Sequence, residues 1–175
     1  MEHFRLVAEA TSLPIIVYNI PGRTGMNITP KTMAELAAIP NIIGDKESAG
    51  DINQAAEIRR ITPDDFIIWS GDDGMTLPMM AVGAVGVISV ASHVAGKQLK
   101  AMIEAFAAGK VQEARAINAQ LMPLYKALFM TTNPIPVKEA VNLLGIEVGG
   151  LRPPMIRAND QVRAALKQVM TDLGI

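Results

Sequence analysis

A lysine at the end of an apolar stretch is the first residue of this 175-residue sequence whose position suggests chemistry. Lys46 follows Ile42, Ile43 and Gly44 in a run with the pattern of a β-strand, and alternation along a strand places it on the face of Ile42 and Gly44. If that face is an interior, burial lowers the pKa of a lysine, and the free amine can attack a carbonyl carbon to form a Schiff base. The alternative is a surface lysine at a strand end.

Two further residues follow the preceding strand-like run. Tyr18 comes near the end of that run, and its hydroxyl could pass protons to and from an amine that forms an imine. Arg23 comes shortly afterwards, in a loop that Pro21 and Gly22 make tight. Its guanidinium is suited to grip a substrate carboxylate with two parallel hydrogen bonds. Core packing of the tyrosine and a solvated arginine are the respective alternatives.

The other polar motifs favour structural roles. The acidic run Gly71–Gly74 could suggest a metal or phosphate site, but a tight turn with acidic residues at a helix start explains it better. His3 and His93 have no neighbours with metal-ligand spacing, and neither a P-loop nor a dinucleotide fingerprint is present.

Four short apolar runs bounded by turn residues are predicted as strands buried on both faces, which is typical of a parallel sheet. They are Pro14–Asn19, Asn41–Lys46, Asp65–Ser70 and Val85–Val90. Helices are predicted over Met1–Ala10, Pro30–Ala37, Ile52–Ile61 and Met75–Val82. The alternation indicates an α/β fold with right-handed crossovers, so Lys46 and Tyr18 should share the carboxyl rim of the sheet.

Only helices are predicted after the fourth strand. They cover Gly96–Ala108, Val111–Met130, Pro134–Leu144 and Asn159–Leu173, with a kink or two abutting segments at Pro123. Four strands are half of a (β/α)8 barrel, which typically needs about 250 residues. The chain is therefore either a smaller open sheet or the C-terminal part of a longer barrel. In the second case, residues 1–95 form the barrel half and residues 96–175 a helical subdomain.

Composition excludes several classes of protein. The net charge is −1, which argues against binding to nucleic acid or to a membrane surface. Cysteine is absent, which excludes disulfide scaffolds and thiol nucleophiles. No targeting signal or membrane-spanning run is predicted, so we expect a cytoplasmic protein.

Five motifs in this order resemble the dihydrodipicolinate synthase (4-hydroxy-tetrahydrodipicolinate synthase) family. They are Tyr18-Asn19-Ile20-Pro21-Gly22-Arg23-Thr24-Gly25, Gly44-Asp45-Lys46-Glu47-Ser48, Ser70-Gly71-Asp72-Asp73, Gly86-Val87-Ile88-Ser89-Val90 and Asn133-Pro134-Ile135-Pro136-Val137-Lys138. The resemblance spans essentially the whole chain, but it covers only the second half of the family's barrel and its helical tail.

The resemblance implies a (β/α)8 TIM barrel and a Schiff-base lyase of lysine and diaminopimelate biosynthesis. Pyruvate would form an imine on Lys46 and then attack aspartate semialdehyde. Tyr18 would be the proton donor and acceptor, Arg23 would recruit the semialdehyde carboxylate, and Gly71 and Ile88 would line the site through their backbone. No cofactor is implied, and a homo-oligomer is expected.

Two alternatives and one departure accompany this resemblance. The chain could be a sister pyruvate-dependent aldolase of the N-acetylneuraminate lyase superfamily, or a non-catalytic remnant that acts as an assembly partner. Asp45 stands where the family usually has an apolar residue. Alternation points it to the face opposite Lys46, where a carboxylate must find a partner or become neutral, unless that end of the strand is exposed.

Overall fold

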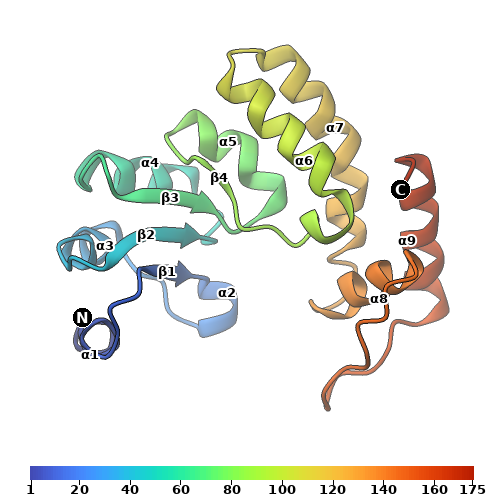
Figure 1. Ribbon diagram of the computed structural model, residues 1–175, viewed down its shortest axis with the longest axis horizontal. Helices are drawn as coiled ribbons and strands as arrows, with labels where there is room; N and C mark the ends of the chain where they lie inside the picture. Colours follow the sequence, from blue (N-terminus) through green and yellow to red (C-terminus); the bar gives the residue numbers. More distant parts are fainter. The chain divides into compact units, whose positions relative to one another are not determined.

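Four parallel strands form one sheet in the order β1, β2, β3, β4 in the computed structural model, which describes residues 1–175 (Figure 1). The strands are β1 (Ile15–Asn19), β2 (Ile42–Glu47), β3 (Ile67–Ser70) and β4 (Gly86–Val87). Each strand pairs in parallel with the next one along the chain, which confirms the α/β class predicted from the alternating runs.

The chain divides into two compact units, Met1–Ile88 and Ser89–Ile175. The domain boundary that the sequence places after residue 95 remains a prediction. The first unit contains the sheet together with α1 (Glu2–Glu9), α2 (Pro21–Thr24), α3 (Pro30–Ala37), α4 (Ile52–Ile61), the short 3-10 helix η1 (Asp73–Met75) and α5 (Thr76–Ala81). The loop predicted at Pro21 and Gly22 is the short helix α2. Its proline lies in the first turn, where the backbone needs no amide donor.

Side-chain caps begin two of the helices that follow strands. The Asp51 carboxylate accepts hydrogen bonds from the amides of Asn53 and Gln54, at 2.8 and 3.3 Å, and so begins α4. The Thr29 hydroxyl accepts one from the Thr32 amide at 3.3 Å and begins α3. These bonds satisfy amides that have no partner inside the helix.

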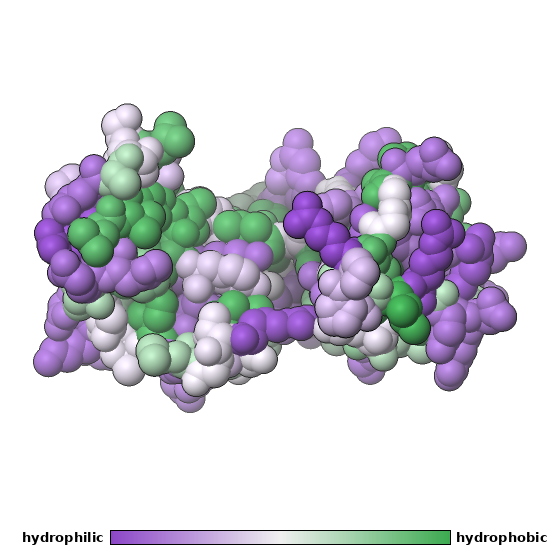
Figure 2. All heavy atoms as spheres, turned by 90° about the horizontal axis from the view of Figure 1, so that it is seen from below, coloured by the Kyte–Doolittle hydropathy of each residue, from purple (hydrophilic) through white to green (hydrophobic).

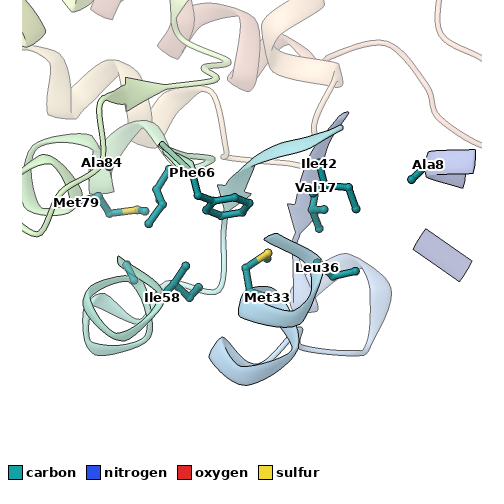
Figure 3. Close-up of a cluster of buried hydrophobic side chains, with 11 residues drawn as sticks. Ala8, Val17, Met33, Leu36, Ile42, Ile58, Phe66, Met79 and Ala84 are labelled. Atoms are coloured by element: carbon teal, nitrogen blue, oxygen red, sulfur yellow. The ribbon is translucent and has the colours of Figure 1, made fainter. Parts of the chain in front are cut away.

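The core of the first unit lies between the sheet and its helices. Met33 and Leu36 of α3 and Ile58 of α4 point into the same cluster as Val17 of β1 (Figure 3). All of these side chains are buried. Burial of such apolar side chains contributes about 1.5–3 kcal/mol each, so this cluster fixes the helices against one face of the sheet.

The predicted fourth strand is shorter in the structure than in the sequence pattern. Val85 and Ile88 still donate amide hydrogen bonds to β3, to the carbonyls of Ile68 and Ser70, both at 2.9 Å. Only Gly86–Val87 has strand geometry, because β3 ends at Ser70 and the chain then turns into η1.

The second unit is helical, as predicted. It consists of α6 (Ser92–Ala107), α7 (Val111–Ala127), α8 (Ile135–Leu143) and α9 (Asp160–Asp172). Of the two outcomes expected at Pro123, two abutting segments are wrong, because α7 runs through Pro123 as one helix, while α6 is kinked at Ala95. Pro123 cannot donate to the carbonyl of Ala119, but Ala119 is exposed, so water can satisfy that carbonyl.

The face of the sheet opposite the helices is only partly covered in the first unit. Ile16, Tyr18 and Ile88 have exposed fractions of 40%, 43% and 37%. The space-filling view shows hydrophobic residues exposed among polar ones at its left, where Figure 1 places α1 and β1 (Figure 2).

None of the helices combines the length and apolar character that crossing a bilayer requires.

Candidate active site

Lys46 and Tyr18 are brought together by the pairing of β1 and β2. The two residues are register partners in the parallel ladder. The Nζ atom of Lys46 lies 4.0 Å from the centroid of the Tyr18 ring. The face of an aromatic ring attracts an ammonium group at this distance, so the tyrosine holds the lysine head at the carboxyl end of the strands.

The face of Lys46 differs in one detail from the sequence prediction. The ladder shifts between Ile15 and Ile16, so that Ile15 pairs with Ile42 and Ile16 pairs with Gly44. Ile42 consequently joins the buried cluster on the helix side, and Lys46 shares its face with Gly44 but not with Ile42. Lys46 is half-buried.

Gly71 lies against the stem of Lys46. A methyl group added at Gly71 would lie 1.8 Å from Ser48 Oγ and 3.1 Å from both Cε and Cγ of Lys46. The Gly71 amide also donates to the carbonyl of Glu47 at 2.8 Å. With a side chain at this position Ser48 Oγ would have to turn away and the Lys46 stem would have to move by a few tenths of an ångström, so glycine leaves room for both.

The two other predicted residues also lie after strand ends. Arg23 is on α2, directly after β1, and is exposed. Ile88 follows β4 and is bound through its amide to Ser70 of β3. The structure therefore brings Tyr18, Lys46 and Gly71 together, and it places Arg23 after the end of β1 and Ile88 after the end of β4.

Asp45 lies on the helix side of β2, as alternation predicted. Its register partners are Val17 and Ile68, which both belong to the buried cluster. The side chain is fully buried, and neither carboxylate oxygen has a hydrogen-bond partner. Burial, and to a smaller extent the charge of Glu47, raises the pKa of Asp45 to about 8. Of the outcomes considered from the sequence, the structure therefore selects the neutral carboxylic acid at pH 7.

The sequence reasoning missed two polar residues that are directly behind the site. Asn19 and Glu47 have exposed fractions of 1% and 2%, and they are register partners at the strand ends. They lie next to Tyr18 and Lys46 along the chain. In the sequence, the only sign of them is that each is a polar residue at the end of an apolar run. That Asn19 and Glu47 lie opposite each other becomes visible only in the register of β1 and β2.

The acidic turn after β3 has the structural role predicted for it. Asp72 accepts a hydrogen bond from the Gly74 amide at 2.8 Å and begins η1. No group of three or more potential metal ligands is found in the chain.

The first unit is thus a partial α/β fold with a lysine–tyrosine pair at the carboxyl ends of parallel strands. The chain belongs to the dihydrodipicolinate synthetase family, whose model matches residues 1–173. It is 56% identical over 174 residues to a 4-hydroxy-tetrahydrodipicolinate synthase of Nostoc punctiforme, covering 99% of this chain and 59% of that protein. The chain therefore spans little more than half the length of this relative.

Solved structures give the same result. The dihydrodipicolinate synthase from Cyanidioschyzon merolae with lysine bound matches with a TM-score of 0.96 at 45% identity, over 99% of this chain and 59% of that one. A chloride-inhibited dihydrodipicolinate synthase from Acinetobacter baumannii, complexed with pyruvate, matches with a TM-score of 0.94 at 36% identity, over 99% of this chain and 60% of that one. These likenesses confirm the family resemblance and its TIM-barrel type of fold.

Proposed function

We propose that this chain is part of a Schiff-base lyase that condenses pyruvate with aspartate semialdehyde, with Lys46 as the amine that forms the imine. The observation that carries the proposal is the placement of Lys46 Nζ over the Tyr18 ring, 4.0 Å from its centroid, in a chain of this family. The Acinetobacter baumannii relative, which is complexed with pyruvate, supports the choice of the first substrate.

The proposed steps assign one role to each of the two residues. The neutral amine of Lys46 bonds to the carbonyl carbon of pyruvate, and the carbonyl oxygen leaves as water, which creates an imine. Protonation of the imine nitrogen and loss of a proton from the adjacent methyl group give an enamine, whose carbon bonds to the aldehyde carbon of the semialdehyde while the aldehyde oxygen takes up a proton and becomes a hydroxyl group. The amino group of the semialdehyde then bonds to the imine carbon, and the Lys46 amine leaves. The Tyr18 hydroxyl delivers and accepts protons in these steps, which is general acid–base catalysis.

The remaining predicted residues have supporting roles in this proposal. Arg23 binds the carboxylate of the semialdehyde, and its exposed place after β1 leaves it accessible to a substrate. Gly71 and Ile88 contribute backbone to the walls of the site. Gly71 has the closer support, because it lies against the Lys46 stem.

We also propose that the chain supplies half of a (β/α)8 barrel, with residues 1–95 in the barrel and residues 96–175 as its helical subdomain. The support is topological. The four strands follow one another in sequence order, and every element after β4 is a helix. A closed barrel of this type needs four further strands outside this chain. We further propose that the protein is cytoplasmic and forms homo-oligomers.

Reduction with borohydride in the presence of pyruvate tests the proposed role of Lys46. The reduced adduct is stable, and peptide mass mapping should find it on Lys46. Lys46→Arg keeps the charge but lacks the nucleophile, and should form no adduct, while the exposed Lys31→Arg serves as the matched control. An adduct at the wild-type level in Lys46→Arg would show that another amine reacts.

Two further measurements test the proposed role of Tyr18 and the identity of the aldehyde acceptor. Tyr18→Phe keeps the ring under Lys46 but removes the hydroxyl, so adduct formation should slow by about 10²- to 10⁴-fold, the usual contribution of general acid–base catalysis. Comparison of the rates with aspartate semialdehyde and with other aldehydes then distinguishes the synthase from a sister aldolase. A chain that forms no adduct with pyruvate would be a non-catalytic remnant.

A further inference from the structure

A buried carboxylate and a buried amide cross-link the two strand ends that carry the lysine and the tyrosine. The Nδ2 atom of Asn19 donates to both carboxylate oxygens of Glu47, at 3.2 Å to Oε1 and 3.0 Å to Oε2. Both residues are almost completely buried. Hydrogen bonds to an ionised carboxylate are stronger and more directional than neutral ones, so this link fixes β1 and β2 relative to each other.

Glu47 receives two more donors from the segment that follows it. The Ala49 amide donates to Oε1 at 2.5 Å, and the Nε2 atom of Gln54 donates to Oε2 at 3.0 Å. Gln54 lies on α4, so the carboxylate joins the end of β2 to the helix that covers it. A buried carboxylate is costly unless it is hydrogen-bonded, and here three different donors satisfy it.

Asn19 extends the same set of bonds to the segment after α2. Its Oδ1 atom accepts from the Ile28 amide at 3.0 Å, and its Nδ2 atom donates to Asn27 Oδ1 at 2.8 Å. Asn27 in turn donates to Gln54 Oε1 at 2.8 Å. We name Asn19, Asn27, Glu47 and Gln54 the strand-end network. It ties together β1, β2, α4 and the segment that follows Arg23.

The strand-end network and the candidate active site lie on opposite faces of the same two strands. Asn19 directly follows Tyr18, and Glu47 directly follows Lys46, so alternation turns the two pairs to opposite sides of the sheet. On the site's face Tyr18 is 43% exposed, so packing fixes its position only in part. The backbone beneath it must supply the rest, and the network holds that backbone.

We propose that Glu47 and Asn19 are positioning residues, which hold the ends of β1 and β2 so that Tyr18 and Lys46 stay at the separation that imine chemistry requires. This inference rests on the proposed function, because it assigns the reaction to Lys46. Displacement of a reacting group by about 1 Å can cost about 10²-fold in rate, so a loosened strand end should be visible in kinetics.

Two single variants and their combination test the link between the residues. Glu47→Gln has nearly the same volume but turns an amide group toward the Asn19 amide, and Asn19→Asp places two carboxylates face to face. The double variant Asn19→Asp/Glu47→Gln restores one donor opposite one acceptor. We expect each single change to slow the formation of the borohydride-trapped pyruvate adduct by about 10- to 100-fold, and the double variant to recover much of that rate.

A matched control separates positioning from a loss of stability. The Thr62 hydroxyl is also buried in the first unit and donates to the carbonyl of Ile58 at 2.8 Å, at the end of α4. Thr62→Val removes this bond without touching the strand-end network. It should lower the unfolding midpoint but leave the adduct rate of the folded protein unchanged. Gln54→Met removes one donor to Glu47 from the rim of the network and offers a milder variant if the single changes above prevent folding.

A second readout does not depend on pyruvate. Competitive acetylation compares the labelling of Lys46 with that of the exposed Lys31, and the ratio reports how Lys46 is placed. We expect the ratio to change severalfold in Glu47→Gln, or less strongly in Gln54→Met, and to be unchanged in Thr62→Val. If wild-type protein forms no adduct, the proposed function fails, and the ratio still decides the inference. An unchanged ratio and an unchanged adduct rate in folded Glu47→Gln or Gln54→Met would overturn it.

Discussion

Asp45 and Glu47 lie on the same face of β2, but only the carboxylate of Glu47 has hydrogen-bond donors. Glu47 accepts from Asn19, Gln54 and the Ala49 amide. Both oxygens of Asp45 lack a partner in a fully buried position. The protein thus holds one acid with several donors and one acid with none on the same side of a strand, and burial disfavours the charge of the second.

This difference predicts that the contribution of Asp45 to the stability of the protein decreases as pH rises. Burial first, and the charge of Glu47 second, raise the pKa of Asp45 from 3.8 to about 8. Between these two pH values the folded protein keeps a proton on Asp45 that the unfolded protein has released. A rise in pH therefore favours unfolding. The contribution of Asp45 to the free energy of unfolding is complete below about pH 4 and falls by about 1.4 kcal/mol per pH unit until about pH 8.

Asp45→Asn tests that slope, because the amide has almost the same volume and does not titrate. Urea unfolding of both proteins at several values between pH 5 and pH 8 should show the variant gaining stability relative to the wild type as pH rises. Asp64→Asn is the control, since Asp64 is exposed and its loss should leave the slope unchanged. Parallel stability curves for Asp45→Asn and the wild type would contradict a neutral Asp45.

The meeting of Lys46 and Tyr18 could be predicted from the sequence, because strand ends in a parallel sheet meet at one edge. The apolar runs before Lys46 and Tyr18 defined those ends, and the structure places the two residues in register. The shift between Ile15 and Ile16 could not be read, since it depends on how two strands fit together. It is the reason that Ile42 faces the helices while Gly44 faces the site.

The strand-end network escaped prediction for a related reason. Asn19 and Glu47 are distant in sequence, and each resembles an ordinary polar residue at the end of an apolar run. Only pairing of the strands brings them into contact. Pro123 illustrates a different limit, because local propensity predicts a break, whereas the exposure of Ala119 makes the lost helical bond inexpensive.

Gly71→Ala should disturb the site more than it disturbs the fold. The added methyl group would meet Ser48 Oγ first and the Lys46 stem second. Overpacking of this kind typically costs about 1–3 kcal/mol, and displacement of the lysine should slow adduct formation severalfold or more. Pyruvate trapping and urea unfolding measure the two effects.

A second substitution and a neutral glycine provide the controls for this prediction. Ser48→Ala removes the nearest atom, so Gly71→Ala/Ser48→Ala should recover part of the lost stability. Gly96→Ala adds a methyl group where no atom lies within 4 Å, and should leave adduct formation unchanged. Wild-type trapping rates in Gly71→Ala would show that the lysine stem tolerates the methyl group.

Arg23→Ala should impair use of the semialdehyde much more than it impairs stability. Arg23 is exposed on α2, and a surface substitution usually changes stability by no more than about 0.5 kcal/mol. Loss of the guanidinium should raise the KM for the carboxylate-bearing aldehyde, and Arg23→Lys should restore only part of the effect because lysine cannot form two parallel hydrogen bonds.

Arg60→Ala provides the comparison for Arg23, since Arg60 is also exposed and is paired with Glu57 at 2.6 Å on α4. Its removal should change neither KM nor the thermal midpoint appreciably. A large loss of stability with unchanged kinetics in Arg23→Ala would instead identify a structural arginine.

The isolated 175-residue chain should associate with itself and be nearly inactive, because the sheet face opposite the helices is partly uncovered. Exposed apolar surface and open strand edges favour association between chains. Tyr18 would also lack any catalytic partners that lie on strands outside this chain, and loss of members of a group of residues that act together costs orders of magnitude in rate. Sedimentation velocity and a coupled assay measure both properties.

Fusion to the missing part of a relative provides the positive control for this expectation. The residues of the Nostoc punctiforme protein that this chain does not match can be joined to it, which should complete the fold and restore turnover. Half of the fold is insufficient in this interpretation because catalysis needs both the covered face and the complete relay. A monomeric 175-residue chain that turns over pyruvate and semialdehyde at about 10 per second, an ordinary enzyme rate, would show that the half barrel is sufficient.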